Sequence, residues 1–234
     1  MKWDVSLKSW LSRLVSCLAL AGGIETALGG EEKETRAAAK PSQADYPKGF
    51  IVEGPLPDGF PVPSEAGKIV EKSYPLCRTF SAQGNRAFSK CFVYLVLHKH
   101  EMTAPVIMDY KHRESEKKSR SRNDLDFLDV QRMHFVLGNP TLDKPKQEGF
   151  VQVADLPRLR VLSLARQGEL SPDELKRCEE RLNAELARRG DVIATGPPRI
   201  LGYNSPMVPK DRSYWEVQIP IEAKQPKGTE SPKS

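Results

Sequence analysis

The sequence has few cysteines, few aromatic residues and no long apolar run, and each shortage excludes a class of protein. Four cysteines in 234 residues are too few for a disulfide scaffold. No stretch approaches the roughly 20 consecutive apolar residues of a membrane-spanning helix, and no heptad pattern indicates a coiled coil. With 38% hydrophobic and 29% charged residues, the composition instead favours one sizeable core with a well-solvated surface.

Common catalytic and metal-binding signatures are also missing. The chain has no GxSxG, HExxH or phosphate-binding loop and no GxGxxG after a strand. Cys77, Cys91 and Cys178 lack the CxxC spacing of a zinc knuckle, so we expect buried small hydrophobic residues, with one disulfide as the alternative in an oxidising compartment. The net charge of +5 is mild and dispersed, which predicts no nucleic-acid partner.

The N-terminus has the order of a secretory signal peptide. Three basic residues in the first 13 positions precede the apolar run 14–21, and small residues follow up to position 30. This pattern predicts a signal peptide at residues 1–29 and an exported protein, periplasmic or secreted. A retained interfacial anchor or an ordinary cytosolic extension are the alternatives. Glu25 interrupts the apolar part, so no stable membrane span is expected.

Three further segments have the composition of loops. Residues 30–63 are rich in Glu, Lys, Ala, Pro and Gly and are predicted to be a linker. Residues 111–122 hold six basic and two acidic side chains and are predicted to form a flexible charged loop. Residues 224–234 contain no large apolar residue and are predicted to be a disordered tail.

Between these segments, one pattern of elements occurs twice. Residues 67–81 and 150–165 each favour an extended strand broken by a proline, Pro75 in the first and Pro157 in the second. Apolar spacing then predicts helices over 86–98 and 171–189, the second capped by Ser171. Two strands follow each helix: 104–110 and 132–137 in the first half, 199–203 and 214–221 in the second.

The duplication predicts the fold class. Two strand-helix-strand-strand units that cannot bury a sheet face alone would pack into one α+β domain, with a distorted barrel-like sheet and two main helices, over residues 64–223. Aligning the last strands of the two halves sets His134 opposite Glu216.

The motifs of this region resemble those of the SOUL family of haem-binding proteins. They stand in the family's order: VEKSYP at 70–75, MTAPV at 102–106, HFVL at 134–137, YNSP at 203–206 and Glu-Val at 216–217. The resemblance implies a pseudo-twofold α+β domain. It also implies a groove for haem, another tetrapyrrole or a similar small hydrophobic molecule. The fold is similar as well to the effector-binding domains of the gyrase-inhibitory-protein-like group.

The resemblance directs attention to the first helix. Phe88, Phe92 and Leu95 would supply apolar surface for a macrocycle, although apolar residues at helical spacing are more often core. His98 and His100 follow directly and are candidate ligands for haem iron. The alternative is that both are surface histidines in a polar stretch.

His134 and Glu216 form a second candidate site. In the gyrase-inhibitory-like group, a glutamate at the position of Glu216 faces the ligand groove. There a carboxylate would balance a cationic ligand or, beside a histidine, act as a general base. The alternative is that both residues are exposed on the strand face opposite Met133 and Phe135. The hydroxyl of Tyr203 would reach the same groove.

The sequence thus predicts a binding protein that needs no catalysis and holds haem or a related amphipathic molecule. A hydrolase or effector-binding protein using Glu216 is the second hypothesis, and an interaction module without a ligand is the third. The oligomeric state is left open.

Overall fold

The computed structural model describes residues 41–84, 86–112 and 127–224. The predicted signal peptide, most of the predicted charged loop and the polar tail lie outside the described residues. The described strands are β1 (Ile69–Tyr74), β2 (Cys77–Gln83), β3 (Val106–His112), β4 (Leu128–Val136), β5 (Lys146–Glu148), β6 (Val151–Leu156), β7 (Leu159–Gln167), β8 (Val192–Ala194), β9 (Arg199–Gly202) and β10 (Tyr214–Ala223). The helices are α2 (Ala87–Leu97) and α3 (Pro172–Arg188), with 3-10 turns at Gln43–Asp45 and Lys210–Arg212.

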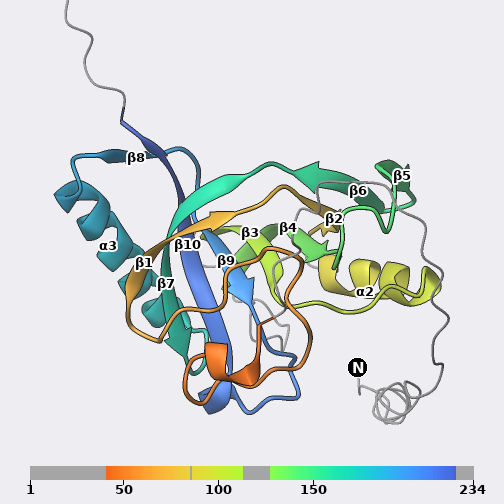
Figure 1. Cartoon of the computed structure of the whole chain (residues 1–234), viewed down its shortest axis with the longest axis horizontal. Helices are drawn as coiled ribbons and strands as arrows, with labels where there is room; N and C mark the ends of the chain where they lie inside the picture. Colours follow the sequence, from red (N-terminus) through yellow and green to blue (C-terminus); the bar gives the residue numbers. More distant parts are fainter. Residues whose placement is uncertain (1–40, 85, 113–126, 225–234) are drawn as a thin grey trace, which may run out of the picture. The chain divides into compact units, whose positions relative to one another are not determined.

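The strands form one antiparallel sheet whose order is β1-β7-β10-β9-β3-β4-β2-β6-β5, and β8 pairs with β10 (Figure 1). The predicted α+β class is confirmed. The sheet stays open, with β1 and β5 at the two ends of the order, so it does not close into a barrel.

The predicted duplication is visible in the strand order. β3 and β9 pair at the centre, and outward from them β4 and β2 on one side match β10 and β7 on the other. Each half then receives its next strand from the opposite half of the chain, since β1 pairs with β7 and β6 pairs with β2. The prolines at positions 75 and 157 mark the points where the chain leaves one half for the other.

Both helices pack on one face of the sheet, at its two ends (Figure 1). On α2 the buried stripe contains Cys91 and Leu95, and on α3 it contains Leu175, Cys178 and Leu182. Ser171 caps α3 as predicted, because its hydroxyl oxygen accepts the Glu174 N–H at 3.3 Å. Successive side chains along a strand point to opposite faces of the sheet. Because apolar side chains are buried on both faces, the protein has two separate hydrophobic cores.

The second core is closed by the segment 46–64, drawn in orange in Figure 1. Its apolar side chains Phe50, Leu56 and Phe60 are buried against the sheet face that carries no helix. Part of the predicted linker is therefore folded. The sequence did not predict this, because three isolated apolar residues among prolines and glycines show no helical or strand period. Each of them is nevertheless buried in the core.

Two of the sequence motifs, MTAPV and YNSP, form hydrogen bonds with this segment. In the MTAPV turn, the Ala104 N–H donates to the Pro55 carbonyl at 3.0 Å. In the YNSP turn, the Asn204 amide donates to the Ile51 carbonyl at 2.8 Å, and the Ser205 hydroxyl donates to Glu53 at 2.8 Å.

The described cysteines are free and buried, as expected for small hydrophobic residues. Burial raises the pKa of the Cys91 thiol to about 12 and that of Cys77 to about 11, so these thiols stay protonated. Within the described residues, neither helix has the length and hydrophobicity to cross a membrane.

Candidate functional site

The outward side of α2 is an apolar surface. Phe88, Val93, Val96 and Leu97 are 41%, 56%, 44% and 72% exposed. Phe92 is half-buried between them and stacks on Phe88, with ring centroids 6.0 Å apart. Of the three predicted apolar residues, Phe88 and Phe92 thus belong to this surface, whereas Leu95 is buried in the core.

A rim of basic residues borders the apolar surface. Residues 84–100 contain no Asp or Glu, while Arg86, Lys90 and Lys99 carry positive charge. The Lys90 ammonium lies 5.1 Å from the centroid of the exposed Phe150 ring, on the turn between β5 and β6. An apolar surface with a basic rim favours a ligand that is apolar and acidic.

Glu216 lies at the centre of a buried polar network on the other face of the sheet. Its Oε1 accepts the Lys72 ammonium at 2.7 Å and the Ser64 N–H at 2.8 Å. Its Oε2 accepts the Ser163 hydroxyl at 2.8 Å and the Gln218 amide at 3.1 Å. Burial lowers the pKa of Lys72, although the adjacent carboxylate opposes that shift.

This network anchors the covering segment. The Lys72 ammonium also donates to the Val62 carbonyl at 2.9 Å, and the Tyr214 hydroxyl donates to the Ser64 carbonyl at 2.5 Å. Four donors from the described residues therefore surround the Glu216 carboxylate, and the residue is fully buried. A hydrolase that uses Glu216 as a base would first have to displace residues 62–64.

His134 occupies the position that matches Glu216. In the register, His134 pairs with Ile107, Ile107 with Leu201, and Leu201 with Glu216, so both residues lie in one row across the sheet. They lie on the face opposite Phe135 and Val217, but they are buried rather than exposed. Two strands separate them, so they do not form an acid–base pair.

The partners of His134 and Tyr203 are limited. His134 Nε2 lies 2.9 Å from Asp109 Oδ2, while its Nδ1 is buried without a hydrogen-bond partner among the described residues. The Tyr203 hydroxyl is likewise buried and unpartnered in the described part of the chain. Burial, reinforced by the nearby Glu216 carboxylate, raises the pKa of Tyr203 well above its ordinary value.

His98 and His100 lie together with Asp143, a residue that the sequence did not single out. The three side chains offer ligand atoms within 4.8 Å of one another. His98 Nε2 is 3.0 Å from Glu148 Oε1, and His100 Nε2 is 3.4 Å from Asp143 Oδ2. The signal in the sequence was weak, because Asp143 is one acidic residue in a polar loop 43 residues after His100.

The predicted iron ligation depends on which side of α2 the histidines occupy. His98 follows Tyr94 by one helical turn and stacks on it at 4.0 Å, so it continues the inward side of α2. The exposed residues Val93 and Leu97 project away from that side. The helical phase therefore places His98 on a different side of α2 from Val93 and Leu97, and ligation of iron by His98 or His100 stays a prediction.

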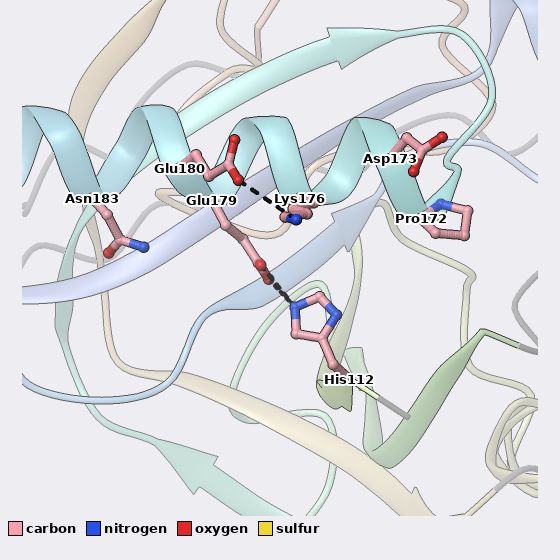
Figure 2. A pocket seen from close by; sticks show the side chains of 7 residues that line it. All are labelled: His112, Pro172, Asp173, Lys176, Glu179, Glu180 and Asn183. Atoms are coloured by element: carbon pink, nitrogen blue, oxygen red, sulfur yellow. Dashed lines mark hydrogen bonds and ion pairs between the residues drawn. The ribbon is translucent and has the colours of Figure 1, made fainter. Parts of the chain in front are cut away.

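A surface hollow of about 470 Å³ lies beside α3 (Figure 2). Figure 2 shows His112 pointing from the end of β3 toward Glu179, whose carboxylate lies 2.7 Å from His112 Nε2. The Tyr110 hydroxyl donates to the same carboxylate. The titratable groups at the centre of this hollow are thus paired with each other.

The sequence matches no protein-family model and no curated protein. Among solved structures, it is similar to the C-terminal domain of EcmrR, with 17% identity over 66% of this chain and 97% of that one and a TM-score of 0.46. EcmrR bound to DNA also matches, at 18% identity over 66% and 57% of the two chains and a TM-score of 0.44.

Two further similar structures come from other proteins. One is a hydrolase from Listeria innocua, with 9% identity over 68% and 94% of the two chains and a TM-score of 0.48. The other is SAV2435 bound to tetraphenylphosphonium, with 9% identity over 66% and 94% and a TM-score of 0.38. The expected absence of a nucleic-acid partner stays a prediction.

Proposed function

We propose that this chain binds a small molecule with a flat apolar body and acidic substituents on the outward surface of α2. Tetrapyrroles, haem among them, have this chemistry. The observation that carries the proposal is the exposure of Phe88, Val93, Val96 and Leu97 on one helix. A helix that is apolar on all sides is normally buried, and large exposed apolar patches usually mark a binding surface.

Energetics support a flat ligand on this surface. Apolar area removed from water contributes about 25 cal/mol per Å², so a molecule that covers several of these side chains gains several kcal/mol. The stacked rings of Phe88 and Phe92 offer an aromatic face, and planar π-systems favour such offset contacts.

Charge selects the sign of the ligand. Arg86, Lys90 and Lys99 border the surface, and no acidic residue lies between positions 84 and 100. Carboxylates on the ligand would be paired by these side chains, whereas a cation would be repelled. The buried carboxylate of Glu216 offers no competing cation site, because Lys72 already neutralises it.

We also propose that the protein is exported from the cytoplasm. The support for export is the N-terminal sequence pattern alone. Binding of this kind requires no catalytic step, and the proposal includes none.

Titration of metal-free protoporphyrin IX into the full chain tests the proposal. We expect saturable one-to-one binding, followed by porphyrin fluorescence. Val96→Asp or Leu97→Asp should weaken the affinity at least tenfold, because each places a negative charge on the apolar surface. Met207→Asp is the matched control, since Met207 is 62% exposed on the turn between β9 and β10, and it should bind as the native chain does.

Equal binding by Leu97→Asp and the native chain would overturn the proposal, as would an equal loss in Met207→Asp. Haemin should bind with the same affinity as the metal-free porphyrin, and a His98→Ala, His100→Ala variant should retain that affinity. A large advantage for haemin that disappears in this variant would show that the pair ligates iron, contrary to this expectation.

A further inference from the structure

We infer that His98, His100 and Asp143, with Glu148 beside them, form a binding site for a divalent transition metal ion, with Zn²⁺ as its representative. This site shares no ligand residue with the apolar surface of α2, and the inference does not rest on the proposed function. Three residues offer ligand atoms within 4.8 Å of one another, and each is half-buried at the end of α2.

The C-terminal turn of α2 brings the two histidines together. The Lys99 N–H donates to Val96 at 3.2 Å, and the His100 N–H donates to Leu95 at 3.0 Å, which is the Schellman pattern that closes a helix. Lys99 sits in the left-handed region at φ 55°. The chain therefore reverses between the histidines, and their rings lie nearly parallel with centroids 5.9 Å apart.

Contacts from the chain hold the Asp143 carboxylate in place. Its Oδ2 accepts the Tyr94 hydroxyl at 2.7 Å, and its Oδ1 accepts the Lys144 N–H at 2.8 Å. These contacts fix the orientation of the carboxylate, and hydrogen-bonded carboxylates are typical of oriented metal ligands.

The donor set indicates the class of metal. Imidazole nitrogens with carboxylate oxygens suit Zn²⁺, Co²⁺ and Ni²⁺, whereas Mg²⁺ and Ca²⁺ prefer oxygen ligands alone. Tetrahedral Zn²⁺ with ligands at about 2.1 Å needs donor atoms about 3.4 Å apart. The distances from His98 to Glu148, 3.0 Å, and from His100 to Asp143, 3.4 Å, are already close to that value.

The ammonium group of Lys146 lies beside the two carboxylates of the proposed site. Its Nζ is 3.3 Å from Asp143 Oδ1 and 3.2 Å from Glu148 Oε2, so one positive charge is shared between two negative ones. Its side chain is about one-third exposed and can turn toward water. A divalent ion would replace this single charge, so Lys146 acts as an internal competitor for the site.

Zn²⁺ titration of the untagged full chain, by calorimetry and by competition with a chelating dye, tests this inference. The chain has only four histidines, which allows a matched comparison. We expect one Zn²⁺ per chain, and at least a tenfold loss of affinity in His98→Ala, in His100→Ala and in Asp143→Asn. His112→Ala removes a histidine that is paired with Glu179 elsewhere, and it should leave the affinity unchanged.

Lys146→Met provides an opposite expectation. Methionine keeps the apolar stem of the lysine but removes the competing charge, so Zn²⁺ affinity should rise several-fold. Co²⁺ should give visible absorption bands of tetrahedral coordination that disappear in His98→Ala, while circular dichroism reports that each variant is folded.

Native affinity in the His98→Ala, His100→Ala double variant would overturn the inference. Weaker or unchanged binding in Lys146→Met would overturn it too. Porphyrin binding by the same double variant reports on the proposed function separately, because the apolar surface does not include these histidines.

Discussion

Charged residues in this protein differ in how much their ion pairs contribute to stability. Lys72 and Glu216 form an ion pair with both side chains buried. Arg160 and Glu71 form one on the surface, with an Nη2–Oε1 distance of 2.6 Å. A buried pair that loses one partner leaves an uncompensated charge, whereas surface pairs contribute about 1 kcal/mol or less. The two pairs therefore allow a direct comparison.

We expect Lys72→Met to lower the free energy of unfolding by about 3–5 kcal/mol, because Glu216 then lacks its counter-charge. Arg160→Ala should cost less than about 1 kcal/mol. Adding Glu216→Gln to Lys72→Met should restore part of the loss. Urea unfolding followed by circular dichroism measures all three, and equal losses in Lys72→Met and Arg160→Ala would contradict the role of the network.

Asp143 gives the protein an acid dependence of stability. Its folded pKa of about 2 lies below its ordinary value of 3.8, so the folded state favours the ionised form. The stabilisation is complete above about pH 4 and is lost as the pH falls toward 2. In Asp143→Asn this component should be absent, so the difference in melting temperature from the native chain should shrink between pH 5 and about pH 2. A difference that is constant across that range would contradict it.

At the scale of elements, regular periods were predictable and irregular segments were not. The helices over 86–98 and 171–189 were predicted to within one residue at each end, because spacing of three and four and the Ser171 cap are local signals. The short strands β5 and β8 were missed, since three residues carry no period. The covering segment 46–64 was missed for the same reason.

The segment makes a testable contribution to stability. Phe60 is buried and packs edge-on against Tyr74, with ring centroids 5.1 Å apart. Phe60→Ala should therefore cost about 3–5 kcal/mol through lost burial and the cavity that remains. Val52→Ala, at an exposed position of the same segment, should change stability by less than about 0.5 kcal/mol. Similar small effects in both variants would show that the segment is only loosely attached.

The candidate site was partly predictable at this scale. His98 and His100 are two residues apart at the end of a predicted helix, so the sequence alone indicates that their side chains lie near each other. Asp143 and Glu148 come from the chain after β4, and only the packing of that chain against α2 brings them near. The contact of Lys72 with Glu216 could not be predicted either, because the two residues are 144 positions apart in the sequence. They meet only because β1 pairs with β7 and β7 pairs with β10.

For the whole molecule, the duplicated pattern was the most informative feature of the sequence. It predicted one α+β body rather than two small domains, and the symmetric position of His134 and Glu216 about the β3–β9 pair confirms the alignment of the halves. Burial of Glu216 could not be predicted, because the covering segment that contacts it has no counterpart in the repeat.

The exchange of strands between the halves limits how the molecule can come apart. β1 belongs to the first repeat but completes the second, and β6 does the reverse (Figure 1). Separation of either repeat would leave an open strand edge on both, with its backbone groups unpaired. We therefore expect neither half to fold on its own. The boundary between the repeats is visible in the sequence, but we expect the protein to unfold across it as one cooperative unit.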